Sequence, residues 1–454
     1  MEGQDTASFS PIALLLVVVL GYLVWSSPRR YAVCPVLVMV GIVPMGQQLN
    51  VLGLHFYLFR ILLLLGMVRV YVRGEFAALK WTKIDRYFAW WVVVSVIFGS
   101  LSKPSVALFI NRLGDAFNAA GCYYFVRCVV VDLDDIIISV RALAWVSVPV
   151  AILMLIEKVT AHNYLSVFGG VPELTSVRDG SLRCQGAFRH PILAGCFGAT
   201  QFPLFVALWF YGRPHRMLAL VGCLAALAIT VAASSSGALI GLMAAFLGLG
   251  LWKFRTKMRM IRWAVVLTIV ALAMVMKQPV WYLISDLSGL IGGGGWHRSF
   301  LIGQAVKYFN EWWLFGTTYT AHWGPAGEVI AADPNMMDIT NHYIMEGVKG
   351  GILKLGLFVA IIVLCFKAIG RSVRAEPPGA PVAFLYWAFG VSLFAHCLSF
   401  ISITYFDQLI IIWFWLLATI CQIPAIPVTE EAGSEAAPSG EGASQDNPRF
   451  EFQP

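Results

Sequence analysis

The chain has 454 residues and a formal net charge of +7; 59% of its residues are hydrophobic and 13% are charged. A soluble domain carries about 25% charged residues, so this composition excludes a water-soluble enzyme, a nucleic-acid-binding module and a disordered protein. Because a membrane-spanning helix needs roughly 20 apolar residues, we expect an all-α fold, a polytopic membrane bundle of about 12–13 transmembrane helices.

The apolar runs that predict these helices follow one another along most of the chain. They lie near residues 10–26, 32–46, 53–72, 87–102, 105–129, 136–156, 191–211, 217–233, 236–252, 262–277, 343–366, 381–402 and 405–424. We therefore expect an integral membrane domain over residues 1–424. Residues 425–454 are rich in Glu, Ala, Gly, Ser and Pro, a composition that predicts a disordered cytoplasmic tail.

The charges predict the orientation of the chain. Lys and Arg gather in short loops near residues 29–30, 73–86, 213–216, 253–262 and 367–374, and counting the predicted helices places all these loops on one side. By the positive-inside rule that side is cytoplasmic. Two long segments, residues 157–190 and 278–342, are then outside. Within the second, residues 296–313 have apolar positions at helical spacing and predict an interfacial helix with Arg298 in its first turn.

Several cations fall on the predicted outer side, against the orientation rule. They are Arg178, Arg183, Arg189, His190, His297, Arg298 and His342. Anionic lipid headgroups would explain them, and so would a substrate phosphate or diphosphate, which Arg binds with paired hydrogen bonds. We found no motif for a nucleotide, a metal or a cofactor, so we expect neither a metal nor a cofactor.

Among the charged residues inside predicted membrane helices, three need an account of their own. Arg112 and Asp115 are three residues apart on one helix, which favours a structural ion pair. Arg60 could extend to the membrane surface or line a groove for a lipid diphosphate, and we leave it unassigned.

Four segments between residues 180 and 365 resemble, in order, the motifs of the O-antigen ligase and O-antigen polymerase superfamily. The segment from Arg183 to Gly195 (RCQGAFRHPILAG) is similar to its R-x-x-G-x-F-x-x-P motif, and residues 234–239 (SSSGAL) to its serine-rich motif. The segment that starts at Arg298, with WLFG at residues 313–316, resembles a third motif. Residues 341–351, which include His342, resemble a fourth.

This resemblance implies a glycosyltransferase in the bacterial inner membrane, with its active site at the periplasmic face. The donor would be an oligosaccharide or polysaccharide on undecaprenyl diphosphate, and the acceptor a hydroxyl group of a glycan or lipid. His342 would be the general base, Arg183 and Arg298 would bind the diphosphate, and Arg189 is added by its position alone. Other membrane proteins of polysaccharide assembly could be partners. Whether the chain acts as a ligase or a polymerase stays open.

Two alternatives remain, a transporter from another functional class and a third member of the transferase class. A transporter or flippase of a lipid-linked sugar would carry its polar site near the middle of the membrane, whereas here the polar residues gather at the outer side. A protein O-oligosaccharyltransferase would need a protein acceptor, and no segment of the chain suggests a protein-binding domain.

Overall fold

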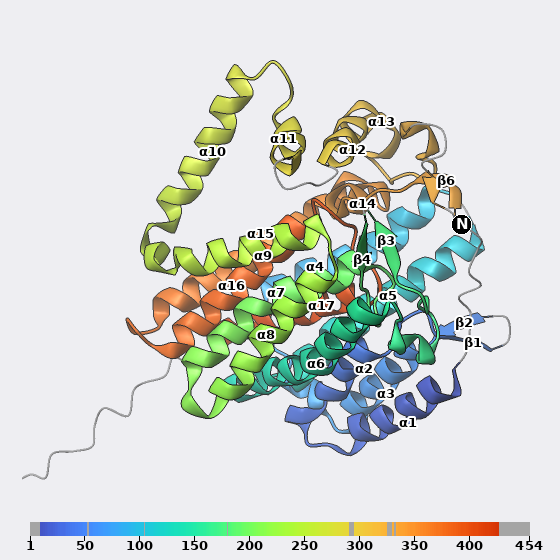
Figure 1. Ribbon diagram of the computed structural model, residues 1–454, viewed down its shortest axis with the longest axis vertical. Helices are drawn as coiled ribbons and strands as arrows, with labels where there is room; N and C mark the ends of the chain where they lie inside the picture. The colour runs from blue at the N-terminus through green and yellow to red at the C-terminus, as the bar shows by residue number, and fades with distance from the viewer. Residues whose placement is uncertain are drawn as a thin grey trace, which may run out of the picture.

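A computed structural model describes residues 10–51, 54–103, 105–178, 180–289, 295–324, 329–330 and 333–425. The predicted disordered tail lies outside the described residues, except for Ala425. In the described part most residues are helical, which confirms an all-α bundle (Figure 1).

The helices follow the predicted apolar runs. They are α1 (Pro11–Ser26), α2 (Cys34–Ile42), α3 (Leu58–Val72), α4 (Lys83–Leu101), α5 (Val106–Val129), α6 (Leu133–Thr160), α7 (Pro191–Tyr211), α8 (Arg216–Ala232), α9 (Ser236–Gly250), α10 (Met258–Val275), α11 (Leu283–Gly289), α12 (Gly295–Lys307), α13 (Phe309–Trp312), α14 (His342–Val348), α15 (Gly351–Ala375), α16 (Pro381–Ser399) and α17 (Asp407–Gln422).

The described strands form three short antiparallel hairpins. These pair β1 (Gln48–Val51) with β2 (Leu54–Tyr57), β3 (Ser176–Arg178) with β4 (Ser181–Arg183), and β5 (Val329–Ile330) with β6 (Asp333–Met337). The second hairpin lies in the predicted outer segment 157–190, and the third in the segment 278–342.

Helix α7 lies at the centre of the bundle and packs against α6, α8, α9, α16 and α17. Glycines allow its close approach to two of these neighbours. A Cβ atom on Gly198 would lie 2.5 Å from the backbone oxygen of Ala226 in α8, and one on Gly195 would lie 2.5 Å from the Cβ of Ala238 in α9. Small residues at such crossings are typical of membrane helix packing.

Seven helical segments of the described chain are long and apolar enough to cross a membrane, which indicates a multi-pass membrane protein. These are Lys83–Leu101, Leu133–Thr160, Pro191–Tyr211, Arg213–Ala232, Ser236–Val275, Gly351–Ala375 and Pro381–Ser399. The other predicted spans are also helices but differ in length or polarity. Helix α2 has 9 residues and α3 has 15, and α5 carries Arg112, Asp115 and Arg127 among its apolar residues.

The predicted span 343–366 is divided into α14 and α15, which is a correction to the sequence interpretation. The break comes at Gly350 and Gly351, where Gly351 has a φ of +75°. A Cβ atom there would lie 2.1 Å from the backbone oxygen of Leu314. The close passage of the chain near residue 314 therefore requires glycine at this turn.

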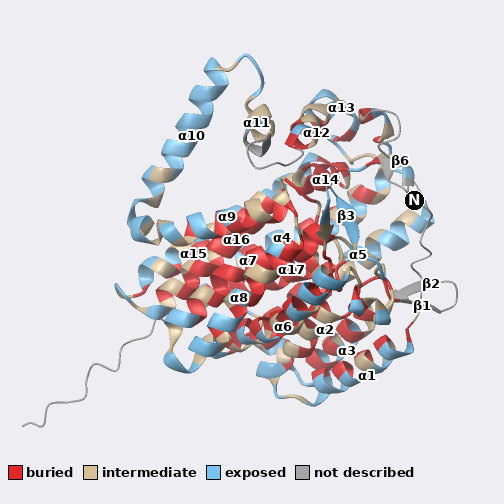
Figure 2. Ribbon diagram, viewed as in Figure 1, coloured by how far each residue is buried: buried red, intermediate tan, exposed pale blue. Residues whose placement is uncertain are grey.

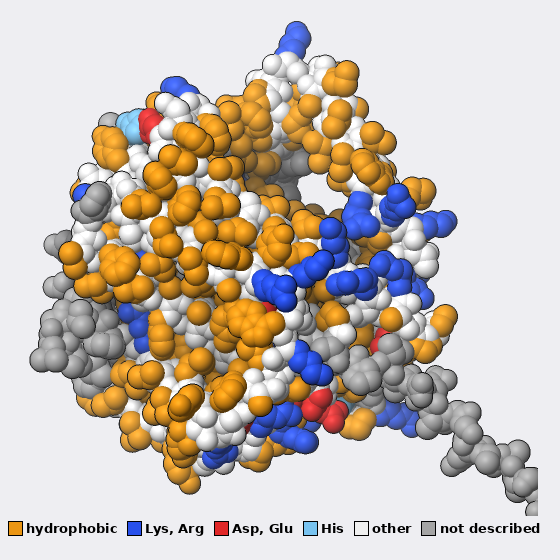
Figure 3. Space-filling model, turned by 180° about the vertical axis from the view of Figure 1, so that it is seen from behind, with side chains coloured by type: hydrophobic (Ala, Val, Ile, Leu, Met, Phe, Trp, Pro, Cys, Tyr) orange, Lys and Arg blue, Asp and Glu red, His pale blue; other side chains and the backbone are white. Residues whose placement is uncertain are grey.

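Helix α10 stands away from the rest of the bundle (Figure 1) and has no buried residue (Figure 2). Basic residues lie near its start, in the segment Leu251–Lys257. Figure 3 shows Lys and Arg side chains gathered along one end of the molecule. Contacts hold two of the basic loops in place. Arg29 forms an ion pair of 2.7 Å with Asp135 at the start of α6, and Arg73 donates to the backbone oxygen of Trp25 in α1 at 2.6 Å.

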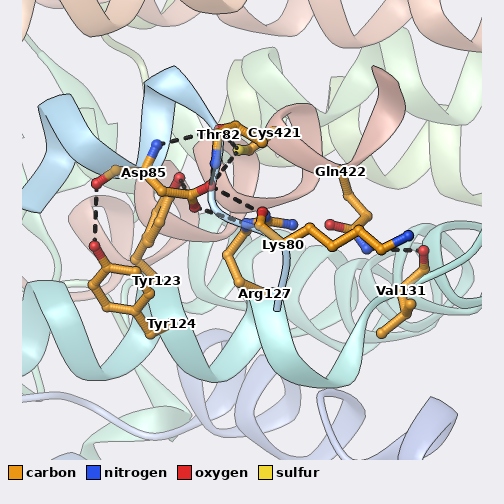
Figure 4. A network of polar contacts seen from close by, with 9 residues as sticks. All are labelled: Lys80, Thr82, Asp85, Tyr123, Tyr124, Arg127, Val131, Cys421 and Gln422. Carbon is orange, nitrogen blue, oxygen red and sulfur yellow. Dashed lines mark hydrogen bonds and ion pairs between the residues drawn. The ribbon is translucent and has the colours of Figure 1, made fainter. Parts of the chain in front are cut away.

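A buried polar network ties α4, α5 and α17 together near this basic end (Figure 4). Arg127 of α5 donates to both carboxylate oxygens of Asp85 in α4, at 2.8 and 3.1 Å. Tyr123 donates to the same carboxylate at 3.0 Å, and the Cys421 thiol of α17 at 3.4 Å. Thr82 begins α4 by a capping box with Asp85. The network thus fixes the start of α4 against two other helices.

Candidate functional site

His342 is the first residue of α14, as the sequence predicts a histidine at a helix start. The Asn341 side chain caps this helix by accepting from the backbone N–H of Ile344 at 3.2 Å. The backbone N–H of His342 donates to the backbone oxygen of Phe400 at 2.8 Å. The imidazole ring of His342 stacks on the Phe400 ring, with the two centroids 4.7 Å apart. These contacts fix the imidazole, and the side chain of His342 is 5% exposed.

The hydrogen bonds of the imidazole determine which nitrogen carries its proton. The backbone N–H of Tyr405 donates to Nδ1 of His342 at 3.2 Å. Burial lowers the pKa of His342 from 6.5 to about 4, so the ring is neutral at pH 7. Since Nδ1 uses its lone pair to accept this bond, the hydrogen of the neutral ring is on Nε2.

His342 lines a cavity of about 230 Å³ near the start of α14, between α4, α5, α15 and α17. Charged side chains from four segments far apart in the sequence line this cavity with it. They are Arg60, Arg112, Asp115, Glu346, Lys349, Lys354 and Asp407. Aromatic residues Tyr57, Trp91, Tyr405, Phe406 and Phe414 form much of the remaining wall. A concave site with a few convergent polar groups is the usual form of a ligand site.

Glu346 holds several of these groups together. It lies one turn after His342 on α14, with its Oε1 3.9 Å from the Nε2 of His342 and 3.5 Å from the Nζ of Lys354. Its Oε2 accepts from the indole N–H of Trp91 in α4 at 2.6 Å. Glu346 and Lys354 are 4% and 5% exposed, respectively. The cavity therefore contains a buried carboxylate whose negative charge is opposed by a buried ammonium.

Arg298 lies in the first turn of α12, as predicted, and its side chain turns toward the bundle. Its Nη2 donates to the hydroxyl of Ser236 at the start of α9, at 3.3 Å. Burial and the nearby positive charge of Arg178 lower the pKa of Arg298. Arg298 is 8% exposed and is not among the residues that line the His342 cavity.

Arg183 and Arg189 lie in the segment before α7. Arg183 is on β4, where its backbone pairs with that of Ser176 in β3. Arg189 is half-exposed and forms an ion pair of 3.0 Å, from its Nε to the Oδ2 of Asp407. Asp407 lines the cavity, so Arg189 contacts a residue of the cavity wall without lining the cavity itself. Arg183 does not line the cavity.

The three intramembrane charges of the sequence analysis all line the cavity. Arg60 donates to the side-chain oxygen of Asn118 at 3.1 Å and lies 4.8 Å from the centroid of the Tyr57 ring. Among the described residues, no contact within 4.0 Å joins Arg112 and Asp115, so the predicted pair is not a direct salt bridge, although the charge of Asp115 acts on Arg112.

The sequence analysis did not identify Glu346, Lys354 or Trp91. One signal was present: Glu346 follows His342 at a spacing of four, which places both on one face of a helix. Together with Lys349 and Lys354 it interrupts a predicted apolar span, and such charges are functional candidates by default. Trp91 carried no signal, because a tryptophan in a membrane helix is ordinary.

No protein-family model matches the chain, and no curated protein sequence matches it. The resemblance over residues 180–365 therefore stays a prediction that rests on the four motifs.

Proposed function

We propose that this chain is a membrane glycosyltransferase of the O-antigen ligase and polymerase type. It would move an oligosaccharide or polysaccharide from undecaprenyl diphosphate to an acceptor hydroxyl, at the outer face of the bacterial inner membrane. The observation that carries the proposal is the cavity in which the imidazole of His342 and the carboxylate of Glu346 lie among several cations.

The place of the cavity within the helices supports a site on the outer side. Lys354 is in the first turn of α15, and Asp407 begins α17. Both helices end toward the basic side of the chain, where α15 carries Arg374 in its last turn. If the basic loops are cytoplasmic, the cavity lies in the outer half of the bundle. The helices beyond the seven long apolar segments would complete the 12–13 crossings.

The chemistry of transfer fits these groups. A diphosphate leaves with its negative charge, and fixed cations in a water-poor site stabilise that charge without a metal. Arg298 and Arg183 are the candidates that the motifs support for binding the diphosphate, and Arg189 is added by its position alone. The acceptor hydroxyl must also lose a proton, for which His342 is the candidate from the sequence.

A flippase of a lipid-linked sugar is the second candidate function. The observation in its favour is that Glu346 and Lys354 are buried within the bundle, as charged residues of transporters are. A flippase would move the lipid-linked donor across the membrane without consuming it. A protein O-oligosaccharyltransferase would consume the donor but label a protein.

The test is glycan transfer in cells that carry His342→Ala or Arg298→Ala. We expect both variants to insert into the membrane normally, to lose transfer and to accumulate the lipid-linked donor. His322→Ala in the outer segment is the matched control and should transfer normally, because His322 lies outside the four motifs and does not line the cavity. Wild-type transfer by both variants would reject the site assignment.

Deletion of the whole protein separates the remaining possibilities by gel analysis of the glycans. Single repeats indicate a polymerase, and uncapped acceptor with free long chains indicates a ligase. Donor that stays on the cytoplasmic side indicates a flippase and contradicts the proposal.

A further inference from the structure

The cavity contains a second proton-accepting group besides the imidazole, and its contacts differ from those of His342. Glu346 binds the Trp91 indole through Oε2, while its Oε1 is 3.5 Å from Lys354, which is the limit of a hydrogen bond. A carboxylate oxygen has two lone pairs. Oε1 of Glu346 therefore keeps the capacity to accept a proton from a molecule in the cavity.

His342 lacks this capacity in the same structure. The lone pair of its Nδ1 accepts the Tyr405 N–H, so its Nε2 is a donor. Nε2 has no hydrogen-bond partner among the described residues, and its nearest carboxylate oxygen is Oε1 of Glu346 at 3.9 Å. His342 is therefore arranged to donate a hydrogen bond to an oxygen in the cavity.

The other carboxylates of the cavity are less suited to accept a proton. Asp407 forms an ion pair with Arg189 at 3.0 Å. Asp115 is exposed on α5, and no hydrogen bond or ion pair within 4.0 Å fixes its carboxylate among the described residues. Glu346 is buried, and Trp91 and Lys354 fix its orientation from two other helices. A fixed carboxylate is better placed for general-base catalysis than a mobile one.

We infer that Glu346 is the general base of the transfer reaction, that His342 donates a hydrogen bond from Nε2, and that Trp91 and Lys354 are positioning residues. This inference rests on the proposed function. The acceptor oxygen forms a bond to the anomeric carbon of the donor sugar. The bond from that carbon to the diphosphate oxygen breaks, the diphosphate keeps the electron pair, and the hydroxyl proton passes to the Glu346 carboxylate.

Other charges also face Glu346. Lys354 of α15 is the nearest cation, Lys349 follows on the same chain segment, and Arg112 faces the cavity from α5. Arg60 and the anions Asp115 and Asp407 complete the charged lining.

The experiment measures transfer by the purified full-length protein in liposomes with a lipid-diphosphate-linked oligosaccharide and its acceptor. We expect Glu346→Gln to reduce the rate by about 100-fold or more, the usual effect of removing a general base. His342→Gln, whose amide can still donate, should lose only about tenfold, the effect of weakening one hydrogen bond. Glu311→Gln is the matched control, because Glu311 also accepts from a tryptophan and lies beside a histidine, Trp323 and His322, but does not line the cavity.

Two further measurements exclude a merely structural role for these residues. Sodium formate should restore transfer by Glu346→Ala, since a small carboxylate fits the cavity and can accept the proton. Lys354→Met should reduce kcat while the KM for the donor stays close to that of the wild type, because the ammonium orients the Glu346 carboxylate. Each variant is first compared with the wild type by gel filtration and thermal unfolding.

The outcomes separate the inference from the proposed function. If folded Glu346→Gln stays within tenfold of the wild type, or if His342→Gln loses as much as Glu346→Gln while formate restores nothing, Glu346 is not the base although the chain is still a transferase. If the wild-type protein consumes no donor with any acceptor, the proposed function itself fails, and the inference with it.

Discussion

Replacing Arg127 by Met should strongly destabilise the protein, because it leaves the Asp85 carboxylate buried without its cation. Both side chains are almost fully buried, with exposures of 1% for Arg127 and 0% for Asp85. Loss of one partner of a buried ion pair costs about 3–5 kcal/mol. Asp85 keeps hydrogen bonds from the N–H and hydroxyl of Thr82, at 2.7 and 2.8 Å, and from Tyr123. We therefore expect the lower end of that range, about 3 kcal/mol.

The assay is reversible denaturant unfolding in detergent micelles, followed by tryptophan fluorescence. The double variant Asp85→Leu, Arg127→Met should recover most of the loss, because apolar side chains of similar size can replace a buried ion pair at little cost. Arg259→Met on the exposed helix α10 is the matched control and should change the free energy of unfolding by less than about 0.5 kcal/mol. A change of less than about 1 kcal/mol in Arg127→Met, or a double variant as unstable as the single one, would refute the reasoning.

Two further predictions concern the segment around α14. Gly351→Ala should destabilise the protein by about 2 kcal/mol or more, because Gly351 has a positive φ and a Cβ would collide with the Leu314 oxygen. Gly356→Ala is the control and should not destabilise the protein, because the space around its Cβ position is open. Equal thermal stability of the two variants would contradict this prediction. Stability should also fall as the pH decreases from 6.5 to about 4, because unfolded His342 binds a proton over this range and the buried imidazole does not. Unfolding midpoints measured across this range should depend less on pH in His342→Gln.

The helices could be predicted from the sequence because each depends on local composition. Every predicted apolar run contains a helix, and Arg298 and His342 lie at the helix starts where their segments predict them. The division at Gly350 and Gly351 was not predicted. It depends on the passage of residues 313–316 beside α15, a contact between segments that hydropathy does not encode.

The composition of the cavity could not be predicted for a related reason. Trp91 and Glu346 are 255 residues apart in the chain, and they meet only because α4 packs against the segment of α14 and α15. Motif spacing identified His342 but not which of its nitrogens is available, since that depends on the backbone N–H of Tyr405. A single hydrogen bond from the segment before α17 therefore decides which nitrogen of His342 can donate and which accepts.

The packing of helices that are far apart in the sequence also explains why the predicted cations do not line the cavity of His342. Arg298 and Arg183 share the outer segments with His342 in the sequence, yet the charges that line the cavity with it are Arg112, Lys349 and Lys354 among others. Charges in a bundle of apolar helices are stable only where other charges or hydrogen bonds oppose them, as in the cavity and in the Asp85–Arg127 network. In that network both carboxylate oxygens of Asp85 accept from Arg127, whereas Oε1 of Glu346 has only the Lys354 ammonium at 3.5 Å and Glu346 lines the cavity. This is the physical reason to look for the reacting proton at Glu346.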